Sequence, residues 1–590
     1  MALKARRYLG PGAWSAFAAL LFLLPNLGGP AFYESFLYLI FSWVALATSW
    51  SLLSGYAGYF SLGHAAFFGA GVYTTATLTT KFDVPFLWTV PIAALVAALL
   101  ATAVGAVVFR LRSLRGELFA LLTLAVTFIL ATIILNTGID GGGGVFLSGV
   151  ALPALAPTAS GTIYRLGLGL AVLAVALSYV VRHSRFGMGL FAIHDDEDVA
   201  EVKGVPTFRY KLMALALSAA IAGAAGGVQA IYVGYVTVGE TFAINVPLYV
   251  ILMSVLGGAR HWFGPAVGAT LITVALFAFT SGGEALLGRA IVALALIVVV
   301  LLLPDGIVPT LLRLADRWRS PERRRPAAEL PPTAVAGEPP HCAAAEKGPA
   351  ILVCDDVRKS FGGIQALRGV TLSVHKGEIL GLVGPNGSGK TTFINMISGH
   401  FSIDRGSIAL GSDPIAGLPA HRIACLGIAR TYQIPRPFNH LSVLDNVALA
   451  ASFGTLLSGR SAILDEAWHW LEFTGLARHA FDLPSKLNLH ERKFLELARA
   501  LAARPQLLLL DEILSGLNPA EVENAITLIR AIRDRGASII FIEHLMRAVV
   551  ELSDRVAVLN EGAVIAIGTP REVMQNPEVV SVYLGKAYAS

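Results

Sequence analysis

The sequence predicts two fold classes in one chain: an α-helical polytopic membrane domain with about 8 to 10 transmembrane helices, followed by a soluble α/β domain. Of 590 residues, 55% are hydrophobic and 14% are charged, whereas soluble proteins carry about 25% charged residues. The charge is also uneven, because roughly 9% of residues 1–310 are charged against roughly 19% of residues 349–590. We therefore expect a membrane domain over residues 1–310 and a soluble domain over residues 350–590.

Apolar runs of near-spanning length recur between Trp14 and Leu303. A helix needs about 20 apolar residues to cross a bilayer, and the three short late runs leave re-entrant segments as an alternative. The candidate spans are residues 13–28, 32–53, 57–79, 86–109, 117–136, 164–182, 209–232, 244–258, 265–280 and 286–303.

Clusters of Arg and Lys lie before the first span, after the fourth, between the sixth and seventh, and after the last. With all of these spans present, the clusters share one side, which the positive-inside rule makes the cytoplasm. The sequence therefore predicts an inner-membrane protein with both termini and the soluble domain in the cytoplasm. A cleaved signal peptide is the alternative for the first span, although no convincing small-x-small cleavage site follows it.

The net charge of +5 does not form a basic stripe on the soluble domain, so we expect no nucleic-acid partner. Cys342, Cys354 and Cys425 lack metal-ligand spacing and are expected to be reduced thiols. Residues 311–349 are rich in Arg, Pro and Ala, which predicts a flexible linker. Its basic start lies beside the predicted membrane span and is expected to contact anionic lipid headgroups.

Glycines gather in the third and seventh spans, which predicts close helix packing; broken helices that line a pathway are the alternative. His64 lies deep in the third span, so either a functional or a structural hydrogen-bonded role is open. Residues 137–146, TGIDGGGGVF, predict an outer loop or a helix break.

The strongest motif is GPNGSGKTT at 384–392, which fits G-x-x-x-x-G-K-[ST] between a predicted strand and a predicted helix. In such a P-loop, backbone N–H groups surround phosphate oxygens at the positive end of a helix. Lys390 is expected to reach the terminal phosphates, and the Thr391 hydroxyl to bind Mg²⁺. The predicted nucleotide-binding residues of the loop are Gly384, Pro385, Asn386, Gly387, Ser388, Gly389, Lys390, Thr391 and Thr392.

Two further predicted strands end in acidic or basic side chains. QLLLLDE ends in Asp511, expected to be the second Mg²⁺ ligand, and Glu512, expected to polarise the attacking water. SIIFIEH ends in His544, expected to contact the γ-phosphate. Glu512 and His544 are the predicted catalytic residues.

The membrane half resembles the permease of branched-chain amino acid ABC importers. The resemblance rests on residues 52–74, 116–130, 184–205 and 255–269, and it extends over nearly all of residues 30–305. It implies one of two permease subunits, with a coupling helix in the loop 183–211 that docks on an ATPase. The loop carries a dense acidic run, although a merely solvated charged loop is the alternative.

Residues 352–586 resemble an ABC transporter ATPase, and the SGLNP and C-terminal segments resemble the branched-chain amino acid type. The resemblance implies that Phe361 stacks on adenine, that Gln433 binds Mg²⁺ and senses the permease, and that about 437–500 form a helical subdomain. The chain thus resembles a natural fusion of a permease subunit with an ATP-binding subunit.

One segment departs from this family. Where the resemblance implies a Leu-Ser-x-Gly-Gln signature facing the opposite ATPase's γ-phosphate, the chain has Asn488, His490 and Glu491. Loss of the glycine removes a close backbone approach, and Glu491 is expected to bring negative charge toward the nucleotide. Ile513 also replaces the usual Pro after Glu512.

The resemblance implies ATP-driven import of branched-chain amino acids, or related small amino acids or amides, with ATP and Mg²⁺ as cofactors. The implied partners are a second permease, a second ATPase with an intact signature, and an extracytoplasmic solute-binding protein. The alternatives are an ABC exporter half-transporter, against which the short Gly-rich spans argue, and an ATP-binding regulatory membrane protein without turnover, which the altered signature favours.

Overall fold

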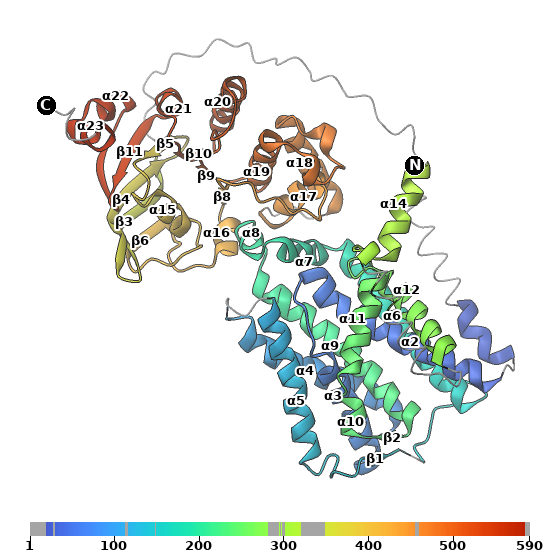
Figure 1. Cartoon of the computed structure of the whole chain (residues 1–590). Coiled ribbons are helices and arrows are strands. Elements are labelled where there is room, and N and C mark those ends of the chain that lie inside the picture. The colour runs from blue at the N-terminus through green and yellow to red at the C-terminus, as the bar shows by residue number, and fades with distance from the viewer. Residues whose placement is uncertain are drawn as a thin grey trace. The chain divides into compact units, whose positions relative to one another are not determined.

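The computed structural model describes residues 19–27, 30–111, 116–147, 149–280, 294, 297, 301–319, 348–454 and 459–584. The chain divides into two compact units (Figure 1). The first unit comprises residues 1–194 and 208–323, and the second comprises residues 195–207 and 324–590. A short piece of the permease-like sequence therefore belongs to the same unit as the soluble half.

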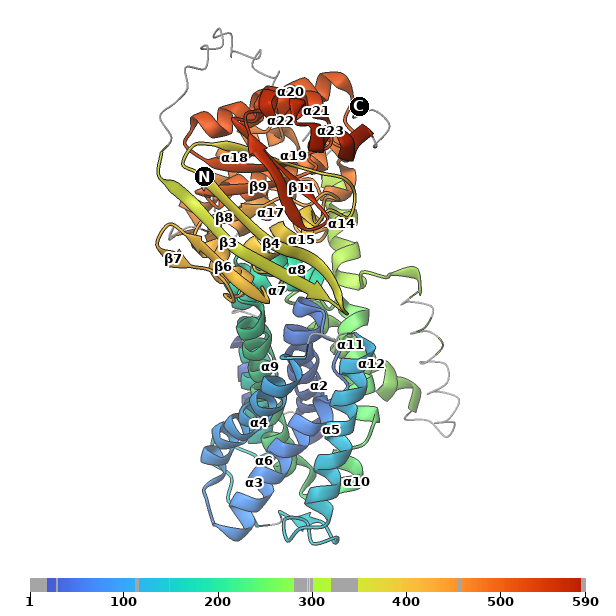
Figure 2. The ribbon, with the colours of Figure 1, turned by 90° about the vertical axis from the view of Figure 1, so that its left-hand side faces the viewer.

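The first unit is a bundle of helices (Figure 2). Its main helices are α2 (Ala31–Trp50), α3 (His64–Lys81), α4 (Phe86–Val108), α5 (Glu117–Leu135), α6 (Ala159–His183), α7 (Arg185–Asp195), α9 (Thr207–Val233), α11 (Asn245–Gly257) and α12 (Gly264–Thr280). Within the described residues, six helical segments are long and apolar enough to cross a membrane. Helix α12 is apolar but shorter; of the predicted span 13–28 the structure describes residues 19–27, and the predicted span 286–303 lies largely outside the described residues.

The predicted third span, 57–79, is interrupted. Helix α2 continues as a π-helical turn, η2 (Ser51–Gly55), and α3 begins only at His64. Between them, the Ser54 hydroxyl donates to the carbonyl of Tyr59 and accepts from the N–H of Ser61, so side-chain hydrogen bonds replace the helical ones. The helix of the third span therefore begins later than predicted, after an irregular turn, and the alternative of broken helices that line a pathway stays a prediction.

His64 lies at the start of α3 and is 2% exposed. Its Nε2 lies 2.7 Å from the Ser49 hydroxyl of α2. This hydrogen bond links α2 to α3 through the imidazole ring, and it fits the structural role considered for this residue.

Glycines bring α3 and α9 close together. A Cβ added to Gly71 would lie 2.0 Å from the carbonyl oxygen of Gly223, and one added to Gly226 would lie 2.1 Å from that of Phe68. These distances leave no space for a side chain, so the small residues permit backbone contact between the two helices. The prediction of close packing is confirmed at these positions.

Residues 137–146 are not helical, as expected. They form turns that lead into β1 (Val145–Phe146), which pairs antiparallel with β2 (Tyr235–Val236). The Tyr73 hydroxyl donates to the Asp140 carboxylate over 2.6 Å and ties the turns to α3. A short helix, α10 (Val238–Thr241), follows β2.

The start of the predicted linker is ordered differently from our expectation. Residues 307–319 form a helix, α14 (Ile307–Arg319), although we predicted a flexible tether from residue 311. The apolar pair Ile307 and Val308 recurs four residues later as Leu311 and Leu312, which is a helical spacing that the Pro-rich composition of the whole segment conceals, and Arg313 pairs with Asp305 at 2.5 Å. The predicted linker residues 320–347 lie outside the described residues.

The second unit contains two β-sheets (Figure 2). Strands β12-β11-β5-β10-β9-β8 form the larger sheet, in which all neighbours are parallel except β11 and β12. Strands β4-β3-β6-β7 form an antiparallel sheet. The strands are β3 (Ala350–Phe361), β4 (Ile364–His375), β5 (Ile379–Val383), β6 (Arg405–Leu410), β7 (Asp413–Pro414), β8 (Ile428–Arg430), β9 (Leu507–Asp511), β10 (Ser538–Ile542), β11 (Arg555–Asn560) and β12 (Ala563–Gly568).

Strands β5, β9 and β10 are buried at every position, which explains their continuous apolar sequences. Because these strands are parallel, their carboxyl ends meet at one edge of the sheet, where ligands bind in open α/β folds. The helices of this unit are α8 (Glu197–Val202), α15 (Lys390–Ile397), α16 (Ala420–Cys425), α17 (Val443–Gly454), α18 (Arg460–Phe473), α19 (Leu489–Ala502), α20 (Pro519–Asp534), α21 (Met546–Leu552), α22 (Pro570–Gln575) and α23 (Pro577–Leu584).

The packing of α3 against α9 predicts opposite effects for two Gly→Ala changes. Gly226→Ala forces the helices apart and should destabilise the protein by about 1–3 kcal/mol, as overpacking does. Gly169→Ala, on α6, meets no atom within 4 Å and should be neutral or stabilising by up to about 1 kcal/mol, because Ala favours helix. Thermal unfolding of the purified full chain measures both; equal Tm values for the two variants would contradict the close approach.

Candidate active site

The phosphate-binding loop connects β5 to α15 as the sequence predicts. Gly384 has φ +154°, and a Cβ there would lie 2.0 Å from the carbonyl oxygen of Leu559. Gly389 has φ +103° and caps the N-terminus of α15. Both positions therefore require glycine, and they set the turn that holds Pro385, Asn386, Gly387 and Ser388 between them.

Lys390 begins α15, and its Nζ donates to the carbonyls of Gly384 (2.7 Å) and Pro385 (2.9 Å). Burial lowers the pKa of Lys390, while the nearby negative charges of Glu512 and Asp511 act in the opposite direction. The ammonium thus lies inside the loop and in the field of both carboxylates. Thr391 and Thr392 follow in the first turn of α15, and Thr391 is exposed.

Asp511 ends β9 and is buried. Burial raises the pKa of its carboxyl, and Arg430 at the end of β8 opposes this shift through an ion pair of 3.1 Å. Carboxylate and hydroxyl oxygens are the ligands that Mg²⁺ prefers, so the chemistry of Asp511, Thr391 and Gln433 fits the predicted metal set.

Glu512 follows with φ +47°, an uncommon conformation for a residue other than glycine. Its N–H donates to the Ile542 carbonyl of β10 over 3.0 Å, which holds the strained residue at the sheet edge. Such strain is concentrated at functional sites in proteins. The geometry agrees with a placed general base.

The structure brings three predicted residues together around one oxygen. Gln433 Nε2 donates to Glu512 Oε2 at 2.5 Å, and His544 Nδ1 lies 3.9 Å from the same atom. Gln433 and His544 are exposed, whereas Glu512 is partly buried. This arrangement places a carboxylate, an amide and an imidazole beside one another.

Phe361 lies at the end of β3 and is 40% exposed. Its ring packs edge-on against Phe401, with centroids 5.2 Å apart. The exposed part of the ring is compatible with stacking on adenine, which stays a prediction.

Sequence reasoning missed two buried cations that hold the site. Arg430 joins Asp511 to Asn395 and Ser398 of α15. Lys493 of α19 donates to the carbonyls of Glu512 (3.2 Å) and Ile513 (3.1 Å). No sequence pattern singled out Lys493, because the buried face of α19 also carries Glu496 and Arg499.

The altered signature forms the N-terminus of α19 in an unexpected way. Asn488 is the N-cap, and its side chain accepts from the Glu491 N–H at 2.8 Å, while the Glu491 carboxylate accepts from the Asn488 N–H at 3.0 Å. The same carboxylate contacts Arg478 (2.8 Å) and His479 (3.1 Å). Burial acts to raise the pKa of Glu491, but these contacts outweigh it and lower the pKa.

The expectation that Glu491 directs an uncompensated charge toward a nucleotide is therefore wrong. Its carboxylate turns back to cap its own helix and is paired with two basic side chains. His490 packs against Phe494, with ring centroids 4.3 Å apart, and Ile513 is buried in the hydrophobic core.

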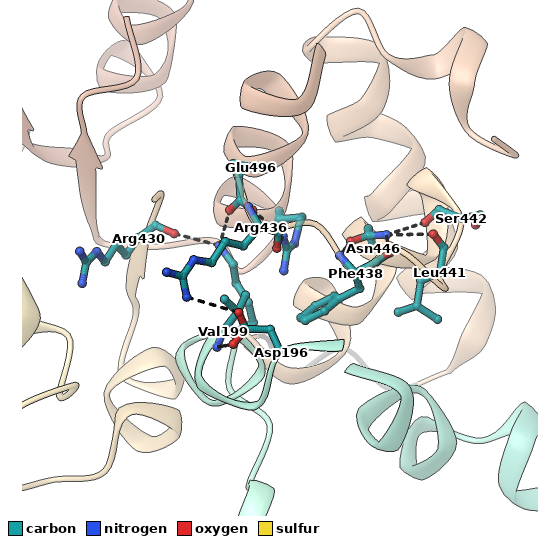
Figure 3. A network of polar contacts seen from close by, with 11 residues as sticks. Asp196, Val199, Arg430, Arg436, Phe438, Leu441, Ser442, Asn446 and Glu496 are labelled. Carbon is teal, nitrogen blue, oxygen red and sulfur yellow. Dashed lines mark hydrogen bonds and ion pairs between the residues drawn. The ribbon is translucent and has the colours of Figure 1, made fainter. Parts of the chain in front are cut away.

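Helix α8 docks on the ATPase fold within the second unit (Figure 3). Asp196 caps α8 and pairs with Arg436 at 3.4 Å. Asp195 accepts from the His440 N–H at 3.0 Å, and Glu201 lies 3.8 Å from His421. The acidic run is thus matched by basic residues of the ATPase, which disfavours a merely solvated loop.

The second residue group that the sequence did not reveal lies at the end of α8. The side chain of Lys203 is 3% exposed; its Nζ donates to the Arg430 carbonyl (2.8 Å) and lies 3.6 Å from Glu496. Glu496 also pairs with the buried Arg499 at 2.6 Å. Burial lowers the pKa of Lys203 to about 8, although Glu496 opposes the shift. One residue, Arg430, thereby contacts both Lys203 and Asp511.

The P-loop, the carboxylates after β9 and the docked helix α8 define an ABC-type ATPase that shares its chain with a helical membrane domain. Three family models match this chain. The branched-chain amino acid transport system permease component matches residues 32–303, the ABC transporter model matches residues 367–515, and the branched-chain amino acid ATP-binding cassette transporter model matches residues 563–589.

Curated relatives match the ATPase half. The high-affinity branched-chain amino acid transport ATP-binding protein LivG of Salmonella typhimurium (strain LT2) is 38% identical, over 40% of this chain and 98% of that protein. The BraF protein of Pseudomonas aeruginosa, a high-affinity branched-chain amino acid transport ATP-binding protein, is 36% identical over 40% of this chain and 98% of that protein. The lipopolysaccharide export system ATP-binding protein LptB of Escherichia coli K12 is 35% identical over 40% of this chain and 99% of that protein.

The chain belongs to the branched-chain amino acid ABC transporter family, with permease and ATPase in one polypeptide. This membership confirms the expected ATP-driven importer in place of an exporter half-transporter. Among solved structures, a nucleotide-free ATP-binding cassette from an ABC transporter is similar, at 28% identity and a TM-score of 0.37 over 40% of this chain and 100% of that one.

The site predicts different failures for two substitutions. Lys390→Ala removes the cation inside the phosphate loop and should abolish tight ATP binding, as judged by a fluorescent ATP analogue. Glu512→Gln keeps the shape of the site but removes the base, so ATP should bind while turnover falls at least about 100-fold. Hydrolysis by Glu512→Gln at the wild-type rate would show that Glu512 is not the base.

Proposed function

We propose that the chain imports branched-chain amino acids, or related small amino acids, across the inner membrane at the expense of ATP bound between its own P-loop and a partner ATPase. The observation that carries this proposal is that α8 belongs to the permease-like sequence and lies in the ATPase unit, where Lys203 is buried. Uptake of labelled leucine by vesicles that contain the assembled transporter tests it.

At the proposed site, Lys390 and the loop N–H groups bind the β- and γ-phosphates, and Phe361 supports the adenine. Mg²⁺, when bound, neutralises phosphate charge, with Thr391, Asp511 and Gln433 as its proposed protein ligands. Glu512 takes the proton of the attacking water, and His544 contacts the γ-phosphate. Gln433 and Lys493 keep Glu512 oriented through its side chain and its backbone.

We propose that α8 transmits nucleotide-driven movement to the permease. The chain runs directly from α8 into α9, so a displacement of the ATPase at α8 pulls on a membrane helix. Arg430 supports this role because its carbonyl holds Lys203 while its guanidinium pairs with Asp511. A change at Asp511 on nucleotide binding therefore reaches α8 through a single residue.

The acidic residues at the start of α8 add specificity to this contact. Asp195 and Asp196 meet His440 and Arg436 near the surface, where such pairs are worth at most about 1 kcal/mol each. Their contribution is mainly orientation, since like charges at these positions would oppose docking. The buried and the exposed charges thus have different roles, because Lys203 holds the helix and the acidic run selects the face on which it docks.

Coupling predicts a selective loss in Lys203→Met. Removing one partner of a buried ion pair costs about 3–5 kcal/mol. We expect Lys203→Met to weaken the docking of α8 and to reduce leucine transported per ATP hydrolysed at least 10-fold, while ATP hydrolysis persists. The matched control is Lys486→Met, since Lys486 pairs with Asp482 on the surface. An unchanged transport-to-hydrolysis ratio in Lys203→Met would contradict the coupling role of this contact.

We further propose that this chain pairs with a different ATPase that carries an intact signature. A helix N-terminus binds phosphate through unsatisfied N–H groups and a positive dipole end. At α19 the Glu491 N–H already donates to the Asn488 side chain, and the Glu491 carboxylate neutralises part of the positive end of the helix dipole. A homodimer would place this self-capped terminus at both nucleotides, whereas a mixed dimer leaves one site competent.

This proposal predicts little ATPase activity from the chain alone in reconstituted membranes and robust activity with a partner ATPase from its own organism. Glu491→Gln in the chain alone should raise activity several-fold, because it removes the carboxylate from the helix terminus. Glu521→Gln is the matched control, since Glu521 forms the same capping box with Asn518 on α20. Robust activity without any second ATPase would contradict the mixed dimer.

A second permease and an extracytoplasmic solute-binding protein complete the proposed assembly. This chain contributes one permease domain. If the substrate path is enclosed between two permease domains, a second permease subunit must supply the other. The proposed orientation, with both termini and the ATPase in the cytoplasm, follows from the basic clusters between the spans.

A further inference from the structure

The first unit contains a cavity of about 180 Å³ between α2, α3 and α9, with β2, α10 and the start of α11 at its edge. Helices α2 and α3 contribute buried residues to it, β2 and α10 include exposed residues, and α9 carries a polar residue, Gln229, where the cavity forms. Polar side chains inside spanning helices are costly and mark substrate pathways. The cavity therefore has the location and the composition of a ligand site.

One wall of the cavity is apolar. Leu39, Trp43 and Leu46 come from α2, and Phe68 and Val72 come from α3. Leu46 and Val72 are each 2% exposed, so this wall is packed into the bundle and does not face lipid. Sites of this kind recognise a hydrocarbon group by shape and burial.

Another part of the lining is polar. Gln229, Thr237, Glu240 and Thr241 line it together with Ser42 of α2. The Tyr38 hydroxyl donates to Gln229 Oε1 over 2.8 Å, and Tyr38 is itself buried against Tyr232 with ring centroids 4.4 Å apart. Because Oε1 is the acceptor in this bond, Gln229 presents its two amide N–H donors as the groups available to a ligand.

The charge of the cavity selects the head group. Among the described residues that line it, Glu240 supplies the one carboxylate and none is Lys or Arg. A carboxylate attracts an ammonium group, while the Gln229 amide and the Thr237 and Thr241 hydroxyls can donate to a ligand carboxylate. A fatty acid or a phosphate would meet Glu240 with the wrong sign.

The size agrees with one small molecule. An apolar cavity of about 150 Å³ in another protein holds benzene, so a cavity of about 180 Å³ has space for a zwitterion with a few more heavy atoms, such as valine.

We propose that this cavity is the binding site for the transported substrate, an α-amino acid with a short branched aliphatic side chain. Glu240 receives the α-ammonium group, Gln229 and Thr241 receive the α-carboxylate, and the wall of Leu46, Phe68 and Val72 encloses the side chain. This proposal rests on the importer function proposed above, and it adds the site and the residues of recognition.

Alkylation of a cysteine placed in the cavity tests binding without transport. Thr241→Cys is made in the full chain with Cys342, Cys354 and Cys425 replaced by Ser, and a small maleimide is the probe. Leucine should slow alkylation at least fivefold, and 4-methylpentanoate, which lacks the amino group, should not. Adding Glu240→Gln should abolish the protection by leucine. Alkylation at the same rate with and without leucine would overturn the proposal.

Transport by the assembled complex gives the second measurement. Leu46→Trp fills the cavity and should abolish leucine uptake while ATP hydrolysis persists; Leu173→Trp, at an exposed position on α6, is the matched control. Uptake by Leu46→Trp at the control rate would also overturn the site. Absence of leucine uptake by the wild-type complex, with protection of Thr241→Cys intact, would instead reject the importer function and keep the cavity as an amino acid site.

Discussion

The docking of α8 in the second unit depends on one buried cation, Lys203. An ammonium group removed from water costs several kcal/mol unless hydrogen bonds and opposite charge compensate it. Here the Arg430 carbonyl accepts a hydrogen bond and Glu496 Oε2 supplies the opposite charge, while Arg499 pairs with the other carboxylate oxygen of Glu496. Because these partners come from separate parts of the ATPase sequence, the pocket for Lys203 exists only when the ATPase is folded. The ion pair therefore makes recognition of the permease segment conditional on ATPase structure.

The parts of the proposed nucleotide site can be located in the sequence because they are local motifs. The P-loop pattern spans eight consecutive residues, and the strand-end carboxylates directly follow apolar runs. Arg430, Lys203 and Lys493 were not predicted, since their roles arise from contacts with residues that are 81, 227 and 19 to 22 positions away. Periodicity and spacing carry no signal for such pairs.

The membrane half was predicted less evenly for related physical reasons. Hydropathy located the long spans, but it began the third span at residue 57, whereas α3 begins at His64. Side-chain hydrogen bonds from Ser54 stabilise the irregular turn between η2 and α3, and the apolar composition conceals this turn. At α14 the error was the reverse, because a flexible segment was predicted where the structure has a helix. The Pro-rich sequence that follows α14 obscured its helical pattern. Glu491 shows a third kind of error, in which the residue type was right and the direction of its side chain was wrong.

The similarity of the ATPase half to known proteins does not identify the substrate. The ATPase half is 38% identical to LivG and 35% identical to LptB, proteins named for branched-chain amino acid transport and for lipopolysaccharide export. Sequences so close to both cannot encode the difference between these cargoes, since phosphate chemistry at the P-loop is common to them. What distinguishes a small zwitterion from a lipid is the shape and charge of the surface that it contacts, and in this chain a small cavity with one acidic side chain, Glu240, and a fixed amide, Gln229, provides such a surface. In this proposal the ATPase drives transport through α8, and the cavity of the permease half recognises the substrate that is transported.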